Sequence, residues 1–277
     1  MVDLFSPPVK KALVIFSSLV SCWTTMAQDT EAYGAGARAL GGSGISLTDA
    51  WSALNNPASL AGFEGLTAGI SYRNRFLVSE MADKSAAVCF NIGDSHFGIG
   101  FTSFGYSLFS RSRMSLSFAR PLAKGFFAGA GVNYHLLRLG ENYGSRRVLT
   151  AQLGAIYQIT KKVSLAAQVF NPTNSRINDY ADERMESMLR LGMRCDFSKR
   201  VFAVAEVAKA LNGKLFIAGG LSYSPHEKLM LRIGANNQSF SFGVGAVFGQ
   251  FLFDLSASYR SIPGFTPELS LLYNAPQ

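Results

Sequence analysis

Charged side chains recur on one face of several predicted strands, and they are the residues best suited to chemistry. The arginines on this polar face are Arg190, Arg194, Arg232 and Arg260, and the acids include Asp196, Glu206 and Asp254. An arginine in a partly dry interior can hold a carboxylate or phosphate by paired hydrogen bonds. The favoured alternative is a lattice of ion pairs that braces the protein, because acids and bases occur on neighbouring segments. The four arginines are candidate ligand-binding residues, and the bracing alternative stays open.

The sequence carries no arrangement typical of an enzyme. His96, His135 and His226 are scattered without the spacing of metal ligands. No glycine-rich loop opens a predicted helix, which argues against a nucleotide site. Serine, histidine and aspartate are all present, but without a nucleophile elbow or a paired base they do not predict an esterase. We expect a protein that is not an enzyme and has no metal and no cofactor.

The chain is apolar but has no long apolar run. Of its 277 residues 48% are hydrophobic and 16% are charged, against about 25% charged residues in soluble domains. No stretch reaches the roughly 18 apolar residues that a membrane-spanning helix needs. The hydrophobicity must therefore be spread thinly, as it is in alternating strands. This pattern excludes a helical membrane protein, a disordered chain and an ordinary soluble enzyme.

The formal net charge of +8 has a local origin. Basic residues gather in the predicted short turns: Lys124, Lys161, Lys162, Lys199, Arg200 and Lys228. Turn solubility is the favoured explanation, and an acidic partner or anionic lipid headgroups are the alternatives. Neither requires nucleic acid as a partner.

The N-terminus has the order of a secretory signal. Lys10 and Lys11 precede the mostly apolar run 12–20, and small or polar residues lead to Ala27. The run is too short to span a membrane, so we expect a signal peptide over residues 1–27. A bacterial lipoprotein signal, with lipidation at Cys22, is the alternative. Both alternatives predict export.

Residues 66–277 divide into fourteen segments that alternate in polarity. The predicted strands are 66–72, 84–92, 96–104, 113–120, 126–138, 148–159, 163–170, 187–196, 201–208, 214–223, 229–236, 239–248, 251–260 and 267–273. In the clearest of them, Phe251, Phe253 and Leu255 alternate with Asp254 and Ser256. Such alternation places one face in lipid and the other in a polar lumen.

The connections between these strands also alternate in length. Every second one is short, and the others include the longest, at 73–83, 105–112, 139–147, 171–186 and 261–266. Outer-membrane barrels have an even number of strands, short periplasmic turns and longer outside loops. We therefore expect an all-β transmembrane antiparallel barrel of about fourteen strands in the bacterial outer membrane, with both termini periplasmic.

Residues 28–65 precede the first strand and do not alternate. They begin with small residues and continue to a turn in which Asn56 is a good N-cap and Pro57 suits the first helical position. Fourteen strands would otherwise enclose a water-filled hole. This segment is therefore predicted to fold into the lumen as a hatch or plug.

One motif in this segment resembles a known family. Residues 36–47 read Gly-Ala-Arg-Ala-Leu-Gly-Gly-Ser-Gly-Ile-Ser-Leu, and Asp49-Ala50 and Asn56-Pro57-Ala58 follow. The motif is similar to the N-terminal signature of the FadL superfamily. That superfamily includes OmpP/FadL/TodX-like transporters of long-chain fatty acids and aromatic hydrocarbons, and PorV/PorQ-like barrels of type IX secretion. The resemblance implies a fourteen-stranded barrel and assigns Asn56, Pro57 and Ala58 to its hatch.

Two functions follow from these observations. The first is passive passage of a hydrophobic or amphipathic small molecule across the outer membrane. The second is a non-transporting barrel that serves protein secretion or surface attachment, with secretion-system proteins as partners. The compact size and short outside loops, which leave little room for ligand capture, motivate the second. In both, outer-membrane lipid surrounds the barrel.

Overall fold

A computed structural model describes residues 32–140, 144–178, 183–211 and 213–276. Its strands are β1 (Leu66–Asn74), β2 (Ala82–Ile92), β3 (Ser95–Tyr106), β4 (Phe109–Ala123), β5 (Phe126–Leu139), β6 (Ser145–Gln158), β7 (Val163–Phe170), β8 (Arg176–Asn178), β9 (Glu183–Arg184), β10 (Met188–Asp196), β11 (Val201–Ala210), β12 (Leu215–His226), β13 (Leu229–Asn236), β14 (Phe240–Phe248), β15 (Phe251–Arg260) and β16 (Gly264–Asn274). The predicted signal peptide, with Ala27 and Cys22, lies outside the described residues.

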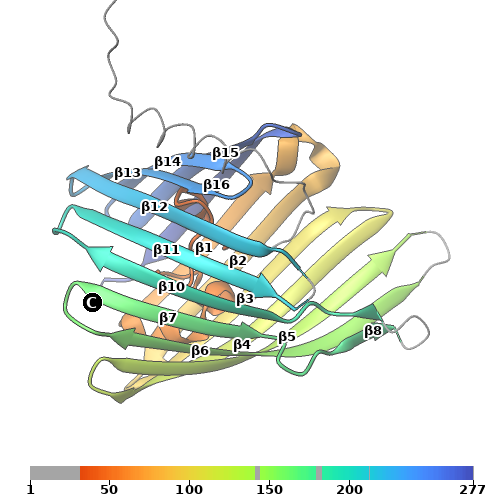
Figure 1. Cartoon of the computed structure of the whole chain (residues 1–277), viewed down its shortest axis with the longest axis horizontal. Coiled ribbons are helices and arrows are strands. Elements are labelled where there is room, and N and C mark those ends of the chain that lie inside the picture. Colours follow the sequence, from red (N-terminus) through yellow and green to blue (C-terminus); the bar gives the residue numbers. More distant parts are fainter. Residues whose placement is uncertain (1–31, 141–143, 179–182, 212, 277) are drawn as a thin grey trace, which may run out of the picture.

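Fourteen of these strands form one closed antiparallel barrel, as predicted (Figure 1). Each strand pairs with its neighbour in the sequence, except that β7 pairs with β10 across the separate β8–β9 hairpin. The ring closes where β1 pairs with β16, for example Ile70 opposite Leu271. Closure leaves the barrel wall without a free strand edge that would invite aggregation.

Side chains on the barrel wall alternate as the sequence predicts. On β15, Phe253 and Leu255 are exposed on the outside, whereas Asp254 and Ser256 are buried. The same alternation along the other strands gives an apolar outer face and a polar interior. This distribution is the reverse of a soluble protein's and is typical of transmembrane barrels.

The prediction of a loop at residues 105–112 is wrong. β3 and β4 continue as a ladder to the pair Tyr106 and Phe109, so the connection contains only residues 107 and 108. The sequence suggested a loop because Gly105 and a run of polar residues interrupt the apolar alternation, yet cross-strand hydrogen bonding continues through them. The wall is consequently uneven in height. β4 has 15 residues, whereas β13 has 8 and lies seven strands away around the ring.

Residues 32–65, here called the inner segment, lie inside the barrel (Figure 1). The segment contains helices α2 (Ala35–Ala39) and α3 (Ser52–Asn55) and the 3-10 helix η1 (Pro57–Gly62). α2 contacts β13 to β16, and α3 and η1 contact β2 to β6. The inner segment therefore reaches opposite sides of the wall. Two further 3-10 helices, η2 (Arg75–Leu77) and η3 (Ser79–Met81), connect β1 to β2.

Small residues let the inner segment approach the strands closely. A Cβ atom at Gly129 of β5 would lie 2.6 Å from the carbonyl carbon of Pro57. One at Gly243 of β14 would lie 2.6 Å from the Cβ atom of Ala39. The missing side chains therefore allow backbone-to-backbone packing that any larger residue would prevent.

None of the helices in the described part of the chain is long and apolar enough to cross a membrane.

Candidate functional site

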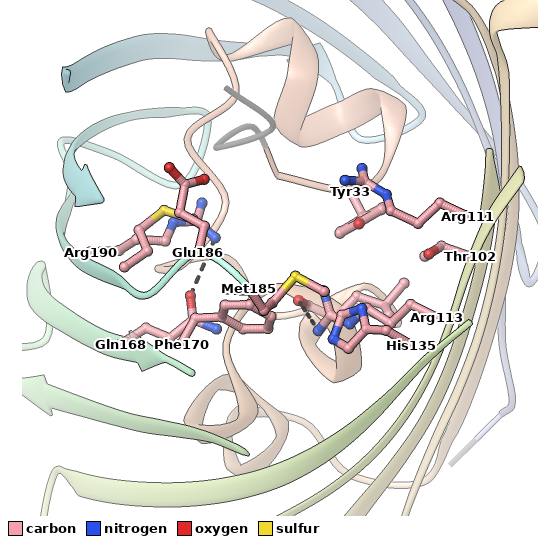
Figure 2. A pocket seen from close by; sticks show the side chains of 12 residues that line it. Tyr33, Thr102, Arg111, Arg113, His135, Gln168, Phe170, Met185, Glu186 and Arg190 are labelled. Carbon is pink, nitrogen blue, oxygen red and sulfur yellow. Dashed lines mark hydrogen bonds between the residues drawn. The ribbon is translucent and has the colours of Figure 1, made fainter. Parts of the chain in front are cut away.

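A pocket of about 130 Å³ lies in the lumen between the inner segment and the wall. We call it the lumenal pocket. Its lining includes Tyr33 and Leu54 from the inner segment, with Arg113, His135, Phe170 and Arg190 from the strands. Figure 2 shows Arg113 and His135 side by side on one wall, with Arg190 across the pocket from them. The pocket thus combines apolar surface with cationic groups.

Arg113 of β4 is buried in this wall, with 9% of its surface exposed. Its Nε donates to Asn133 Oδ1 at 2.9 Å, and its Nη2 donates to Leu54 O and Gln152 Oε1, each at 3.4 Å. Its guanidinium also lies over the Phe170 ring, 5.2 Å from the centroid. These contacts fix the orientation of the cation without neutralising it.

Gln152 of β6 connects the pocket wall to the inner segment. Its Oε1 accepts from Arg113 and from Gln168 Nε2, and its Nε2 donates to Ser117 Oγ at 3.2 Å. The hydroxyls of Ser115 and Ser117 both donate to Ala53 O at 3.1 Å. A continuous buried network therefore joins the pocket to α3.

Arg190 of β10 lies on the opposite wall and is held by an acid. Its Nε donates to Glu206 Oε1 at 2.7 Å. Its Nη1 donates to Gln168 Oε1 at 3.3 Å (Figure 2). Glu206 Oε2 in turn accepts from the backbone amides of Gly44 and Ile45 at 2.9 and 3.3 Å. One carboxylate thus contacts both a pocket residue and the inner segment.

The other three predicted arginines lie elsewhere, so the four do not form one site. Arg194 pairs with Asp196 at 2.8 Å and lines a hollow that includes the turn residues Lys161 and Lys162. Arg232 pairs with Asp254 against Gly36 of α2. Arg260 donates to Gln238 Oε1 at 2.6 Å and lines an outer hollow.

That outer hollow, which we call the vestibule, has a volume of about 450 Å³ and lies next to the lumenal pocket. Its lining includes Arg73, Arg75, Phe104 and Arg260, and it shares Arg111 and Glu186 with the pocket. Arg73 and Arg75 both bond Asp83, at 2.7 and 2.6 Å. The vestibule therefore connects the pocket to the rim that carries the longer loops.

The loop after β7 closes one side of the pocket and is organised by Asn171. The Asn171 amide donates to Ala151 O at 2.7 Å, and its Nδ2 donates to Met185 O at 2.7 Å. Its carbonyl accepts from Ser187 Oγ at 2.6 Å. These bonds place Met185 over the pocket, where Figure 2 shows it between the two walls.

The predicted hatch motif forms the turn into η1. Asn56 Oδ1 accepts from the Ala58 amide at 3.1 Å, so Asn56 is the N-cap and Pro57 the first residue of η1, as predicted. Asn56 Nδ2 also donates to Ile45 O at 2.9 Å, and Ser59 Oγ donates to the same carbonyl at 3.1 Å. The motif therefore ties two parts of the inner segment together.

The histidines do not assemble a metal site. His135 Nε2 lies 3.0 Å from Thr150 Oγ1, His96 is buried on β3, and His226 ends β12. Across the described ranges no three histidine, cysteine or acidic side chains cluster as metal ligands do.

Arg113, by contrast, is a pocket residue that sequence reasoning missed. Its polar-phase position, two residues before Ser115 and four before Ser117, was the available signal.

Comparison with solved structures places this geometry in a known fold. The CymD monoaromatic hydrocarbon channel aligns with a TM-score of 0.69 and 12% identity, over 91% of this chain and 100% of its own. The toluene transporter TodX of Pseudomonas putida aligns with a TM-score of 0.68 and 14% identity, over 90% and 100%. The chain has the fold of the FadL-type outer-membrane barrels.

A FadL homologue of Pseudomonas aeruginosa shares this FadL-type fold, with a TM-score of 0.64 and 12% identity over 90% of this chain and 99% of its own. No protein-family model and no curated protein matches the sequence. At these identities the comparison shows the fold alone. The site residues must be argued from this chain alone.

Proposed function

We propose that this FadL-type barrel lies in the outer membrane and lets a hydrophobic or amphipathic small molecule pass. Both termini face the periplasm, and the longer loops face outward. The main support is the lumenal pocket, which lies between the vestibule and the inner segment and combines apolar walls with cations. The similar structures include a monoaromatic hydrocarbon channel and a toluene transporter, which supports the same class of function.

In this proposal the inner segment acts as the hatch, with Asn56, Pro57 and Ala58 at its centre. A solute enters through the vestibule, rests in the lumenal pocket and leaves when the inner segment shifts. Passage requires binding strong enough to enter and weak enough to leave. The secretion alternative remains a prediction from the sequence motif, and no contact among the described residues adds to it.

Uptake by cells tests the proposal. Cells that lack their own hydrocarbon channels are given the wild-type gene or a variant, and uptake of radiolabelled toluene is measured. Thr102 lines the pocket, so Thr102→Trp fills it and should reduce uptake to the level of cells without the gene. Ile99→Trp, on the outer face of the same strand, is the matched control and should leave uptake unchanged. Equal uptake of toluene and other apolar solutes with and without the gene would contradict the proposal.

A further inference from the structure

Arg113 stands apart from the other buried arginines of the described chain. Four of these five side chains have a carboxylate partner: Arg38 with Glu268, Arg73 with Asp83, Arg190 with Glu206 and Arg232 with Asp254. Within the described ranges, the hydrogen-bond partners of Arg113 are the neutral groups of Asn133, Leu54 and Gln152. Its guanidinium also lies 5.8 Å from the centroid of the Tyr33 ring. Among the described residues, Arg113 is therefore the one buried arginine without a carboxylate partner.

The charges around Arg113 are mostly positive. Arg111 and Arg190 line the same pocket, and Glu186 is the one acid among the described residues of its lining. Burying an unpaired ion costs several kcal/mol even after relaxation. A wall that retains such a cation beside an open pocket is complementary to an anion. Nε and Nη2 of Arg113 already donate to Asn133, Leu54 and Gln152, so Nη1 is the nitrogen that can donate a charge-assisted hydrogen bond to a carboxylate.

The size and walls of the pocket restrict which anion fits. A cavity of about 150 Å³ binds benzene, and the lumenal pocket of about 130 Å³ is close to that size. Phe170 and Tyr33 present rings, and Leu54 and Met185 present apolar side chains. The space suits a single ring better than a long alkyl chain.

We propose that the lumenal pocket binds a compact aromatic carboxylate of about benzoate size. The carboxylate lies on Arg113, and the ring lies against Phe170 and Leu54. This inference rests on the proposed function and narrows its substrate class from hydrophobic or amphipathic molecules to aromatic monoanions.

The vestibule supports the same class of ligand. Among the described residues that line it are four arginines and one acid: Arg73, Arg75, Arg111, Arg260 and Glu186. Asp83 bonds both Arg73 and Arg75 beside it. A cleft lined mainly by one sign of charge concentrates counter-ions and speeds their entry. Anions are therefore drawn toward Arg113, and this effect weakens as salt increases.

Calorimetry on the full chain, purified in mild detergent, tests the inference. The probes are benzoate and toluene, which have similar rings and differ in charge. Benzoate should bind the wild-type protein at one site, and Arg113→Gln should weaken that binding by about 10- to 100-fold, since a hydrogen bond to a charged group contributes about 1.5 to 3 kcal/mol. Toluene binding should change by less than about twofold. Arg120→Gln, at an exposed arginine of the same strand, should leave both probes unaffected.

The outcomes separate this inference from the proposed function. If folded wild-type protein does not bind benzoate, or if Arg113→Gln binds it as tightly as wild type, the inference is wrong. Toluene uptake by cells would then still support passage. If benzoate binds through Arg113 but no solute enters cells, the inferred ligand class is supported and the proposed passage across the membrane is contradicted. If Arg113→Gln does not fold, Arg113→Lys keeps the charge and loses the guanidinium, which can donate to Asn133, Gln152 and a ligand at the same time. It should still weaken benzoate binding, and unchanged affinity would overturn the inference.

Discussion

Glu206 accepts a hydrogen bond from Arg190 at 2.7 Å through one oxygen and holds two backbone amides of the inner segment through the other. Arg190 lines the lumenal pocket, and both side chains are buried. A ligand that draws Arg190 away would therefore weaken the attachment of Gly44 and Ile45. The ion pair between Arg190 and Glu206 therefore links the lumenal pocket to the inner segment.

Glu206→Ala should destabilise the protein by about 3 to 5 kcal/mol, because it leaves Arg190 buried without its acid. The amides of Gly44 and Ile45 also lose their acceptor. Hydrogen exchange at these two amides should become faster, and denaturant unfolding should report the loss of stability. Asp196→Ala is the control: its pair with Arg194 is partly exposed, so the expected cost is about 1 kcal/mol or less. Equal costs for the two variants would refute the attachment role of Glu206.

Gly129→Ala should push η1 away from β5. The added Cβ atom would lie 2.6 and 2.7 Å from backbone atoms of Pro57 and Ala58, which cannot turn aside as a side chain can. Overpacking of this kind costs about 1 to 3 kcal/mol. Ala130→Val, on the outer face of the same strand, should have little effect on the unfolding midpoint in denaturant. A midpoint for Gly129→Ala equal to wild type would show that η1 is not packed this tightly.

Asn56→Ala should cost about 1 to 3 kcal/mol, because it removes both the N-cap of η1 and one bond to Ile45 O. Ser59→Ala removes the other bond to that carbonyl and should cost less, since Asn56 still satisfies it. Denaturant unfolding of the two variants side by side measures the difference. The reverse order of stabilities would show that capping is not the main role of Asn56.

Asp49 gives the inner segment a dependence on pH. Burial raises the pKa of Asp49 to about 7, although its hydrogen bond from the Trp51 amide acts in the opposite direction. An unfolded aspartate titrates near pH 3.9, so between about pH 4 and 7 the folded state binds more protons than the unfolded state. The free energy of unfolding should therefore decrease as pH rises through this window. Asp49→Asn keeps the acceptor oxygen and should flatten that slope in denaturant titrations. A wild-type slope as flat as that of the variant would contradict the prediction.

The strands were predictable because alternation is a local property. The alternation of apolar and polar residues in the sequence places Phe251, Phe253 and Leu255 on the outer face of the barrel. The fourteen predicted segments coincide with the fourteen barrel strands. Strand ends were less predictable. Gly105 resembles a turn residue, yet its neighbours stay paired because the partner strand continues beside them.

The pocket was not predictable, because its residues come from distant parts of the chain. Arg113 and Tyr33 are 80 positions apart, and Glu206 meets Gly44 across 162. Arg190 looks the same in the sequence as Arg113, but only the fold shows that Arg190 has an acid beside it and Arg113 does not. Whether an arginine is available to bind a ligand depends on these long-range neighbours.

The uneven barrel wall also affects the surrounding bilayer. At about 3.4 Å per residue and a tilt of about 40°, a strand of 15 residues such as β4 rises about 39 Å, and one of 8 residues such as β13 rises about 21 Å. The apolar band of such barrels is about 25 Å tall. Lipid beside β13 must therefore thin, or the barrel must lean toward that side, while β4 stands clear of the membrane surface. Hydrophobic mismatch thus gives this barrel a preferred orientation in the membrane and a preference for thin bilayers.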